Sequence, residues 1–417
     1  MNKDRALIEN GAVAISGDKL AAVLPEDELP AGIEAKTVIQ AEGKVVMPGL
    51  INAHSHLAMT LFRGLVEDLD LIPWLEKVWK YELTVLDADS VRAGTKLAFA
   101  EMLRGGVTCA HDMYWYYQEV SQLAEEVGFR LIGGPPITGI GGIDFDLMIS
   151  QAHDELKRLK DFEYVFPIVQ AHSTYTTTPE MMHAVREFKQ EYKVPFTTHA
   201  SENSSEIKQV TEQYGKTPIE LLAGYDLLDE RTVLAHCVKM RDDEIAMLKD
   251  TGTHVVHCPE SNLKLGSGVA RIADMIAAGV NVCLGTDGTA SNNDLNLFGE
   301  MRTAALLQKG VNEDPKVVST LEALEMVTIN GARAYGLDDL IGSLEVGKKA
   351  DVILLDFQKL HLTPCHDIYA NIVYSLGCED IDTVIIDGKI HLDQGELVTI
   401  EEEALIAEVR EIGARFE

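Results

Sequence analysis

Several histidine and aspartate residues of this chain have the types and spacing of metal ligands. His54 and His56 lie two residues apart in the segment PGLINAHSH. On a β-strand, residues i and i+2 point to the same face, so both imidazoles can reach one ion. Neutral imidazole nitrogen is a good ligand for zinc, iron or nickel. This pair, at the end of an apolar run, indicates a metal site.

Three further segments extend this candidate set. His199, in THASENSSE, offers a third imidazole, and Asp287, in LGTDGTASNNDL, offers a carboxylate that can bind a metal and orient water. Glu202 follows His199 by three residues and is the candidate that takes a proton from water and passes it to a leaving nitrogen. His236, in LAHCV, could bind the metal or hold the attacking water and the substrate. Together these residues predict a metal-dependent hydrolase.

Each of these candidates also has an ordinary structural alternative. Glu202 could be an acid in the first turn of a helix, where the helix dipole favours negative charge. Asp287 could belong to a tight turn with the glycine that follows it. His236 could be a histidine satisfied within the core.

The elements that must position these residues are short apolar runs that alternate with longer helix-like stretches. Such alternation indicates βαβ units and a parallel sheet. Eight runs occur in the middle of the chain, which is the number of strands that closes a (β/α)8 TIM-like barrel. They span residues 45–56, 106–114, 130–137, 164–175, 194–201, 232–238, 254–261 and 281–288.

Polar residues cluster where these eight runs end. They are His54, His56, His111, Asp112, His172, His199, His236, His257 and Asp287. The carboxyl ends of the strands face the active site of a TIM barrel, so these side chains are expected at one mouth. A buried polar group without a partner costs a few kcal/mol, and a metal ion at the centre would compensate for that cost.

Short β-like runs bounded by glycine occur at both ends of the chain. They predict a small split β-sandwich domain, formed by residues 1–48 together with residues 344–417, and the second segment ends in a terminal helix. The barrel is expected over residues 49–343.

Composition excludes several classes of protein. The 417 residues carry a formal net charge of −31, which argues against nucleic acid as a partner because phosphates repel an acidic surface. The six cysteines are scattered and form no C-x-x-C pair, unlike a disulfide framework. The first residues show no signal-peptide pattern, and no apolar run is long enough to span a membrane. We therefore expect a cytoplasmic protein without membrane partners, with a homo-oligomer as an open alternative.

The order PGLINAHSH, THASENSSE, LAHCV, HCPESNLKLGSG and GTDGTASNNDL resembles the amidohydrolase superfamily over nearly the whole chain. Within it, the chain is similar to the methylthioadenosine/S-adenosylhomocysteine deaminases, with the s-triazine chlorohydrolases nearby. The resemblance implies Glu202 as proton shuttle and places His236 beside the attacking water. It also implies that one divalent ion, zinc or alternatively Fe²⁺, is held by four side chains: His54, His56, His199 and Asp287. Dinuclear members carry a carboxylated lysine on the fourth strand, which has no lysine here, so one metal is expected.

The resemblance also extends to the substrate pocket. Trp74 and Glu82 match positions that the deaminases use near the nucleoside, and His172 matches a pocket residue. Tryptophan offers an apolar face to the sugar or the 5′ group, and a carboxylate can accept hydrogen bonds from two ribose hydroxyls. Their structural alternatives are a helix-core tryptophan, an exposed helix charge and a core histidine. The expected substrate-binding residues are Trp74, Glu82, His172, Glu202, His236 and Ser291.

The implied reaction is hydrolytic deamination of an adenosine-type nucleoside to the inosine analogue and ammonia. Family members that take S-adenosylhomocysteine hold its carboxylate with arginines after the third strand, but this chain has no arginine between Arg130 and residue 150. A guanidinium is a strong reader of carboxylates. We therefore expect preference for methylthioadenosine, 5′-deoxyadenosine or adenosine.

Two other functions remain as alternatives. The first is a deaminase or chlorohydrolase of another N-heterocycle, such as guanine, cytosine or an s-triazine, for which a Trp74 and Glu82 pair that suits a ribose would have no obvious use. The second is a catalytically silent scaffold, which would be expected to lack metal ligands.

Overall fold

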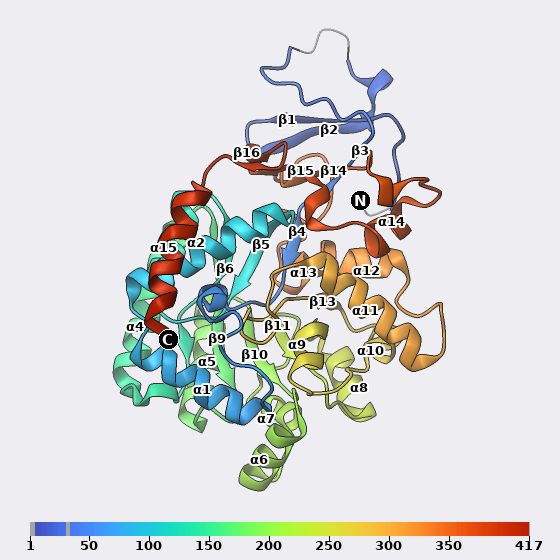
Figure 1. Cartoon of the computed structure of the whole chain (residues 1–417). Coiled ribbons are helices and arrows are strands. Elements are labelled where there is room, and N and C mark those ends of the chain that lie inside the picture. Colours follow the sequence, from blue (N-terminus) through green and yellow to red (C-terminus); the bar gives the residue numbers. More distant parts are fainter. Residues whose placement is uncertain (1–4, 31–33, 417) are drawn as a thin grey trace.

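Parallel strands form a closed barrel in the middle of the chain (Figure 1). The computed structural model describes residues 5–30 and 34–416. The barrel strands are β4 (Leu50–Asn52), β5 (Val107–Asp112), β6 (Arg130–Gly133), β7 (Pro136–Ile137), β8 (Val165–Pro167), β9 (Val169–Ser173), β10 (Phe196–Ala200), β11 (Thr232–His236), β12 (His254–His257) and β13 (Val282–Leu284). A break of two residues separates β6 from β7, and a break of one residue separates β8 from β9. Each of these pairs occupies one position of the barrel, so the ten segments form eight barrel positions. The Ala53 amide donates to the Leu284 carbonyl and joins the last strand to the first.

The barrel strands are continuous apolar runs because both of their faces are buried. Every residue of β5, β10 and β11 is buried. A strand covered by helices on one side and by the barrel interior on the other has no solvent face, and its sequence therefore shows no alternation of polar and apolar residues.

Helices surround the barrel and connect successive strands (Figure 1). They are α1 (Leu71–Thr84), α2 (Ala88–Arg104), α3 (Tyr117–Val127), α4 (Phe145–Arg158), α5 (Pro179–Tyr192), α6 (Ser204–Tyr214), α7 (Pro218–Gly224), α8 (Asp242–Thr251), α9 (Pro259–Lys264), α10 (Ile272–Ala278), α11 (Leu297–Asn312), α12 (Thr320–Met326) and α13 (Ile329–Ala334). Their ends are defined by local capping. Thr178, for example, accepts from the Met181 amide, and Pro179 occupies the first turn of α5, where it costs no hydrogen bond.

Both ends of the chain contribute to an antiparallel β-domain. Its five-stranded sheet has the order β17 (Glu396–Leu397), β16 (Lys389–Asp393), β15 (Ile381–Ile386), β14 (Val352–Asp356) and β3 (Lys44–Pro48). A hairpin of β1 (Gly11–Ser16) and β2 (Lys19–Pro25) lies against this sheet through a small apolar cluster that includes Leu20, Val352 and Ile385. The structure thus confirms a (β/α)8 barrel with a small β-domain built from both chain ends.

The terminal helix, in contrast, packs against the barrel. α15 (Glu402–Gly413) lies beside α2 (Figure 1), and the Phe416 ring lies 5.2 Å from the Phe62 ring and 6.0 Å from the Tyr81 ring. Arg415 donates to the Asp87 carboxylate at 2.8 Å. A short helix, α14 (Ile368–Tyr374), lies in sequence between β14 and β15 of the β-domain. In space it contacts the barrel helices α11 and α12.

A buried ion pair connects the barrel to the β-domain. Arg130, at the start of β6, is 1% exposed and donates two hydrogen bonds to the Asp351 carboxylate at 2.7 and 2.8 Å. Asp387 lies 3.4 Å from the same guanidinium. The only arginine of the third-strand segment therefore has a structural role.

We predict that Arg130→Met lowers the free energy of unfolding by about 3–5 kcal/mol, because it leaves the buried Asp351 carboxylate without its cation, whereas Asp387 keeps its ion pair with Lys349. Urea denaturation followed by circular dichroism measures this loss. Arg92→Met is the matched control, since it removes a partly exposed pair with Glu126 that is worth about 1 kcal/mol or less. Equal stability of the two variants would contradict the prediction.

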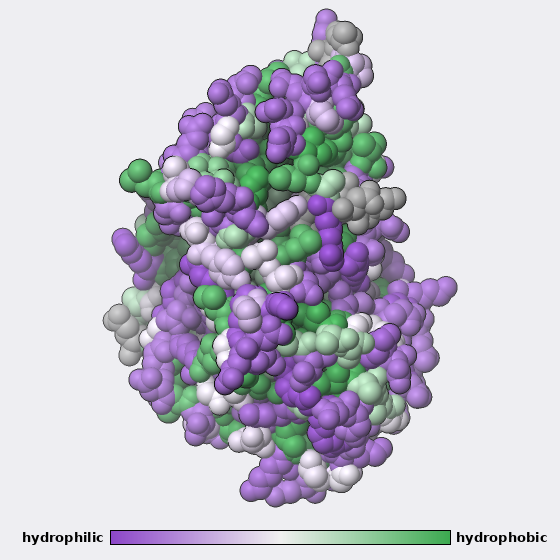
Figure 2. Space-filling model, turned by 90° about the vertical axis from the view of Figure 1, so that its right-hand side faces the viewer, coloured by the Kyte–Doolittle hydropathy of each residue, from purple (hydrophilic) through white to green (hydrophobic). Residues whose placement is uncertain are grey.

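Hydrophilic residues cover much of the face drawn in Figure 2, and hydrophobic residues lie between them in separate groups. Among residues 5–30 and 34–416, we find no helix with the length and apolar character needed to cross a membrane.

Candidate metal and substrate site

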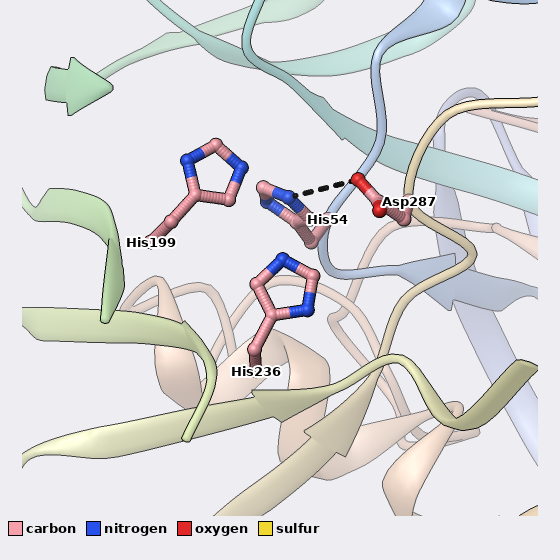
Figure 3. A group of neighbouring side chains, drawn as sticks. All are labelled: His54, His199, His236 and Asp287. Atoms are coloured by element: carbon pink, nitrogen blue, oxygen red, sulfur yellow. Dashed lines mark ion pairs between the residues drawn. The ribbon is translucent and has the colours of Figure 1, made fainter. Parts of the chain in front are cut away.

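Three imidazoles and one carboxylate meet at the carboxyl ends of the barrel strands (Figure 3). His54 follows β4, and Asp287 follows β13. His199 is the last residue but one of β10, and His236 is the last residue of β11. One nitrogen or oxygen atom from each lies within 4.8 Å of the others. All four residues are buried. Segments more than 230 residues apart in sequence therefore converge on one point.

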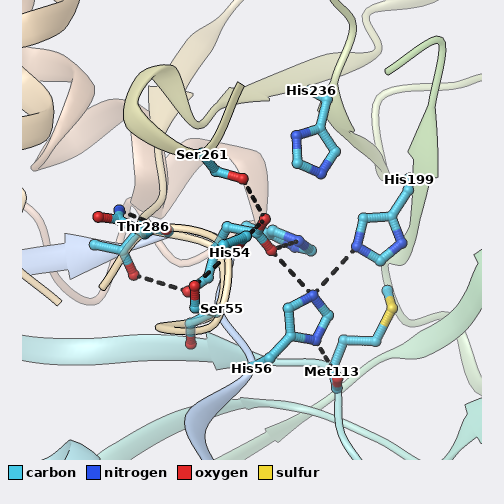
Figure 4. Close-up of polar contacts among 12 residues, drawn as sticks. His54, Ser55, His56, Met113, His199, His236, Ser261 and Thr286 are labelled. Carbon is cyan, nitrogen blue, oxygen red and sulfur yellow. Dashed lines mark hydrogen bonds and ion pairs between the residues drawn. The ribbon is translucent and has the colours of Figure 1, made fainter. Parts of the chain in front are cut away.

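His56 lies against the same group (Figure 4). Its Nε2 is 3.1 Å from Asp287 Oδ1 and 3.3 Å from His199 Nε2. His54 Nε2 lies 3.5 Å from the same Asp287 oxygen. The structure thus brings the four expected ligands together and adds His236 as a fifth neighbouring donor.

Hydrogen bonds determine which ring nitrogens are free. His56 Nδ1 donates to the Met113 carbonyl at 2.6 Å, and His199 Nδ1 donates to the His172 carbonyl at 2.5 Å. Because a carbonyl can only accept, the neutral form of each ring carries its lone pair on Nε2. The two Nε2 atoms face each other at 3.3 Å, an arrangement that requires a cation or a proton between them.

This group fits a divalent metal ion. Neither ring nitrogen of the fully buried His54 has a hydrogen-bond partner among the described residues. An unpaired buried polar group is costly, and coordination would satisfy it. Several imidazoles with one aspartate also form a donor set that zinc and similar ions prefer.

The protonation states agree with such a site. Burial lowers the pKa of His54 to about 4 and lowers that of His199 well below 6.5. Burial would raise the pKa of Asp287, but the adjacent His54 and His56 imidazoles hold it well below 3.8. Burial would lower the pKa of His56, but Asp287 raises it to about 9, so that a proton and a metal ion compete for its Nε2.

The two oxygens of Asp287 have different partners. Oδ1 faces the imidazoles, whereas Oδ2 accepts hydrogen bonds from Ser261 at 2.7 Å and from Ser291 at 2.8 Å. The residue has a φ of +60°, in the left-handed region. Ser291, expected in the substrate pocket, lies behind Asp287 and outside the pocket lining.

Glu202 lies on a turn between β10 and α6. It precedes the N-cap of this helix, Asn203, so it is not a first-turn acid. Its amide and that of Ser201 both donate to the buried carboxylate of Glu206, which fixes the turn. Glu202 Oε2 lies 4.0 Å from His236 Nε2. Burial raises the pKa of Glu202, and the nearby His236 imidazole opposes this increase only in part, so the carboxyl comes closer to the range useful for proton transfer at neutral pH.

A pocket opens above this group. Its lining includes all three tryptophans of the chain, Trp74, Trp79 and Trp115, together with Glu82 and His172. Among the described residues, no lysine or arginine lines this pocket. The carboxylates that line it within the described part of the chain are those of Glu82, Glu202 and Asp287. The pocket is therefore aromatic and apolar, with acidic groups at its floor and wall.

Glu82 and Trp115 form a polar pair on the pocket wall. Both Trp74 and Glu82 lie on α1 and are buried, although each reaches the pocket. The Trp115 indole Nε1 donates to Glu82 Oε2 at 2.9 Å. His172 also lines the pocket, and its Nδ1 lies 3.0 Å from the Thr176 hydroxyl.

Other polar residues at the strand ends support the barrel. His111 contacts the Gln170 side chain at 3.1 Å, and Asp112 accepts from the Leu57 amide at 2.8 Å. His257 is buried outside the pocket lining, with both ring nitrogens unpaired in the described part of the chain. The sequence reasoning missed Trp115, although its place three residues after the end of β5 was a usable signal.

Comparisons with known proteins agree with this geometry. A model described as the Amidohydrolase family matches residues 45–391. The 5-methylthioadenosine/S-adenosylhomocysteine deaminase of Moorella thermoacetica is 42% identical, covering 97% of this chain and 94% of the relative. The 5′-deoxyadenosine deaminase of Methanothermobacter thermautotrophicus is 39% identical over 96% and 93% of the two chains. An adenosine deaminase structure from Xanthomonas campestris with bound zinc has a TM-score of 0.96 and 35% identity, covering 99% and 95%.

Proposed function

Because the chain belongs to the amidohydrolase family, we propose that it is a zinc-dependent deaminase of adenosine-type nucleosides. One observation carries this proposal. The unpaired imidazole nitrogens and Asp287 converge beside the buried carboxylate of Glu202, at the floor of an aromatic pocket that holds a second carboxylate, Glu82.

We assign the metal to His54, His56, His199 and Asp287. The zinc bound in the Xanthomonas campestris adenosine deaminase structure supports zinc as the ion, with Fe²⁺ as the alternative. When bound, the ion would lower the pKa of a water molecule toward neutrality and make it nucleophilic. His236, whose Nε2 faces Glu202, would hold this water against the substrate.

Glu202 carries the proton transfers of the proposed reaction. Its carboxylate accepts a proton from the attacking water as the oxygen adds to C6 of the adenine ring. It passes that proton to N1, then takes the remaining proton of the added hydroxyl and delivers it to the departing amine as the C6–N bond breaks. Water and the nucleoside are thereby converted to the inosine analogue and ammonia, with the carboxylate restored.

The aromatic wall and Glu82 suit the nucleoside. A carboxylate held by the Trp115 indole has free acceptor positions for ribose hydroxyls. Trp74 and Trp79 offer apolar faces to the sugar or the 5′ group.

We predict that Glu82→Gln lowers kcat/KM for adenosine by about 10- to 100-fold, because a hydrogen bond to a charged group contributes about 1.5–3 kcal/mol. Steady-state kinetics measure the change. The same substitution at Glu76, on the same helix but outside the pocket lining, is the matched control. An unchanged kcat/KM in Glu82→Gln would remove Glu82 from nucleoside binding.

The described pocket lining contains no lysine or arginine, which supports a preference for substrates with a short or apolar 5′ group. A buried carboxylate of S-adenosylhomocysteine would find acidic neighbours instead of a guanidinium. We predict that kcat/KM is at least about tenfold lower for S-adenosylhomocysteine than for methylthioadenosine, 5′-deoxyadenosine or adenosine. Parallel assays with the four nucleosides measure this ranking, and S-adenosylhomocysteine as the favoured substrate would overturn it.

The proposed function as a whole is tested by ultraviolet absorbance. The zinc-loaded protein is mixed with each nucleoside and, separately, with guanine and cytosine. Conversion of the adenine spectrum to the hypoxanthine spectrum, with release of ammonia, is the expected result. Turnover of guanine or cytosine alone would favour another branch of the family.

The cysteines support a reducing compartment such as the cytoplasm for this enzyme. All six are free thiols, and four of them are buried. Disulfides are rare in cytosolic proteins, where thiols are kept reduced.

A further inference from the structure

The short helix α9 contributes no metal ligand and no residue to the pocket lining, yet two of its side chains point into the site. Ser261 and Asn262 are 0% and 1% exposed. Both belong to the segment HCPESNLKLGSG, which follows β12 and to which the proposed reaction assigns no role. The position of these two residues requires an explanation.

Asn262 determines the orientation of His236. Its side-chain oxygen lies 2.9 Å from His236 Nδ1. An amide oxygen can only accept, so Nδ1 carries the proton and Nε2 keeps its lone pair. That Nε2 is the nitrogen 4.0 Å from Glu202. His236 has a φ of +75°, a left-handed backbone conformation that is unfavourable for a residue with a side chain.

Ser261, together with Ser291, determines which oxygen of Asp287 faces the imidazoles. The Ser261 hydroxyl donates to Oδ2 at 2.7 Å, whereas Oδ1 is the oxygen that contacts His54 and His56. Hydrogen bonds to the oxygen that does not face the cation stabilise the ionised carboxylate and fix its rotation.

The helix itself is anchored from behind. The Glu260 amide donates to the buried carboxylate of Glu300 on α11, and Thr303 donates to the Glu260 side chain at 2.8 Å. The same Glu300 accepts from Asn292, in the loop that carries Asp287. The segment after β12 and the loop after β13 therefore share one buried support.

We propose that α9 is a positioning element, in which Asn262 holds His236 and Ser261 holds Asp287 in the orientations that the deamination proposed above requires. The proposal rests on that function for the role of His236. For Asp287 it rests only on the fit of the site to a metal ion. The two residues touch neither the metal nor the substrate and act through the side chains that they orient.

The test uses the full-length protein and the variants Ser261→Ala, Ser261→Thr, Asn262→Ala and Asn262→Asp. Leu263→Ala is the matched control, because Leu263 lies on the same helix with 43% of its surface exposed. Three quantities are measured: the zinc dissociation constant by chelator competition, kcat and KM with methylthioadenosine, and the thermal midpoint of the metal-free protein. The last of these separates positioning from a general loss of stability.

We expect Ser261→Ala to weaken zinc binding by about 10- to 100-fold and Asn262→Ala to lower kcat by a similar factor, with KM changed by less than about threefold. Ser261→Thr retains the hydroxyl and Asn262→Asp retains an acceptor oxygen, so both should recover most of the loss. The metal-free midpoints should match that of Leu263→Ala. If Ser261→Ala does not fold, Ser261→Cys, with a weak donor of similar size, carries the same expectation.

The proposal is overturned if both alanine variants match Leu263→Ala in zinc affinity and kcat. It is also overturned if Ser261→Thr is as impaired as Ser261→Ala, since the hydroxyl would then not be the cause. Failure of the wild-type protein to deaminate any nucleoside would overturn the proposed function instead. In that case the zinc affinity of Ser261→Ala still decides whether the helix positions Asp287.

Discussion

Replacing Glu202 by glutamine is expected to lower kcat by about 10²- to 10⁴-fold, the usual contribution of general acid–base catalysis. Glutamine has the same shape and can still accept a hydrogen bond, but it cannot take a proton from water or deliver one to N1 and the amine. The turn that carries the residue should persist, because Glu206 holds it through the backbone amides of residues 201 and 202.

Zinc content and kcat are measured together on the same preparation of Glu202→Gln. The variant should bind one zinc per chain, since Glu202 is not among the assigned ligands. Glu212→Gln is the control, because this residue lies on the adjacent helix α6 with an exposed side chain and should keep kcat within about twofold. A Glu202→Gln enzyme with the wild-type kcat would remove Glu202 from the mechanism.

Replacing His54 by asparagine is expected to abolish stable zinc binding and to reduce activity by about 10³-fold or more. The physical reason is that a bound metal ion lowers the activation free energy of the reaction by several kcal/mol. His54 is fully buried, and neither of its nitrogens has another partner among the described residues. Its removal leaves three of the four assigned ligands, with His236 as the neighbouring donor.

Two readouts distinguish loss of the metal from loss of the fold. Zinc should raise the thermal midpoint of the wild-type protein and not that of His54→Asn, because a ligand stabilises only a state that binds it. His391→Asn is the control, since His391 is also a buried imidazole whose nitrogens are unpaired in the described residues, but it lies on β16 in the β-domain. Full zinc content in His54→Asn would refute the ligand assignment.

The barrel and the identity of its polar residues could be predicted from the sequence for a local reason. Buried parallel strands require continuous apolar runs, and the sharp change to His or Asp at the end of each run marks the mouth of the barrel. The sandwich-like β-domain was predictable in outline from glycine-bounded β-like runs. The position of the terminal helix was not, because the contact of Phe416 with Phe62 joins residues more than 350 positions apart.

The amphipathic helix α1 shows, for the single residue Trp74, what the sequence alone cannot predict. Both a core position and a pocket position require Trp74 to be buried, so burial alone cannot separate them. Only the placement of α1 over the barrel mouth brings Trp74 and Glu82 to the pocket and sets Glu82 against the Trp115 indole. The periodicity of the helix contains no information about that partner.

The sequence by itself determined the kind of chemistry, because residue types and their places at strand ends limit the site to imidazole and carboxylate ligands with a nearby proton carrier. The tertiary structure alone decided how these groups are oriented. It showed which ring nitrogens are free, which oxygen of Asp287 faces them, and that Ser261 and Asn262 stand behind them. Such orientation depends on hydrogen bonds between segments distant in sequence, and a local pattern cannot encode their geometry.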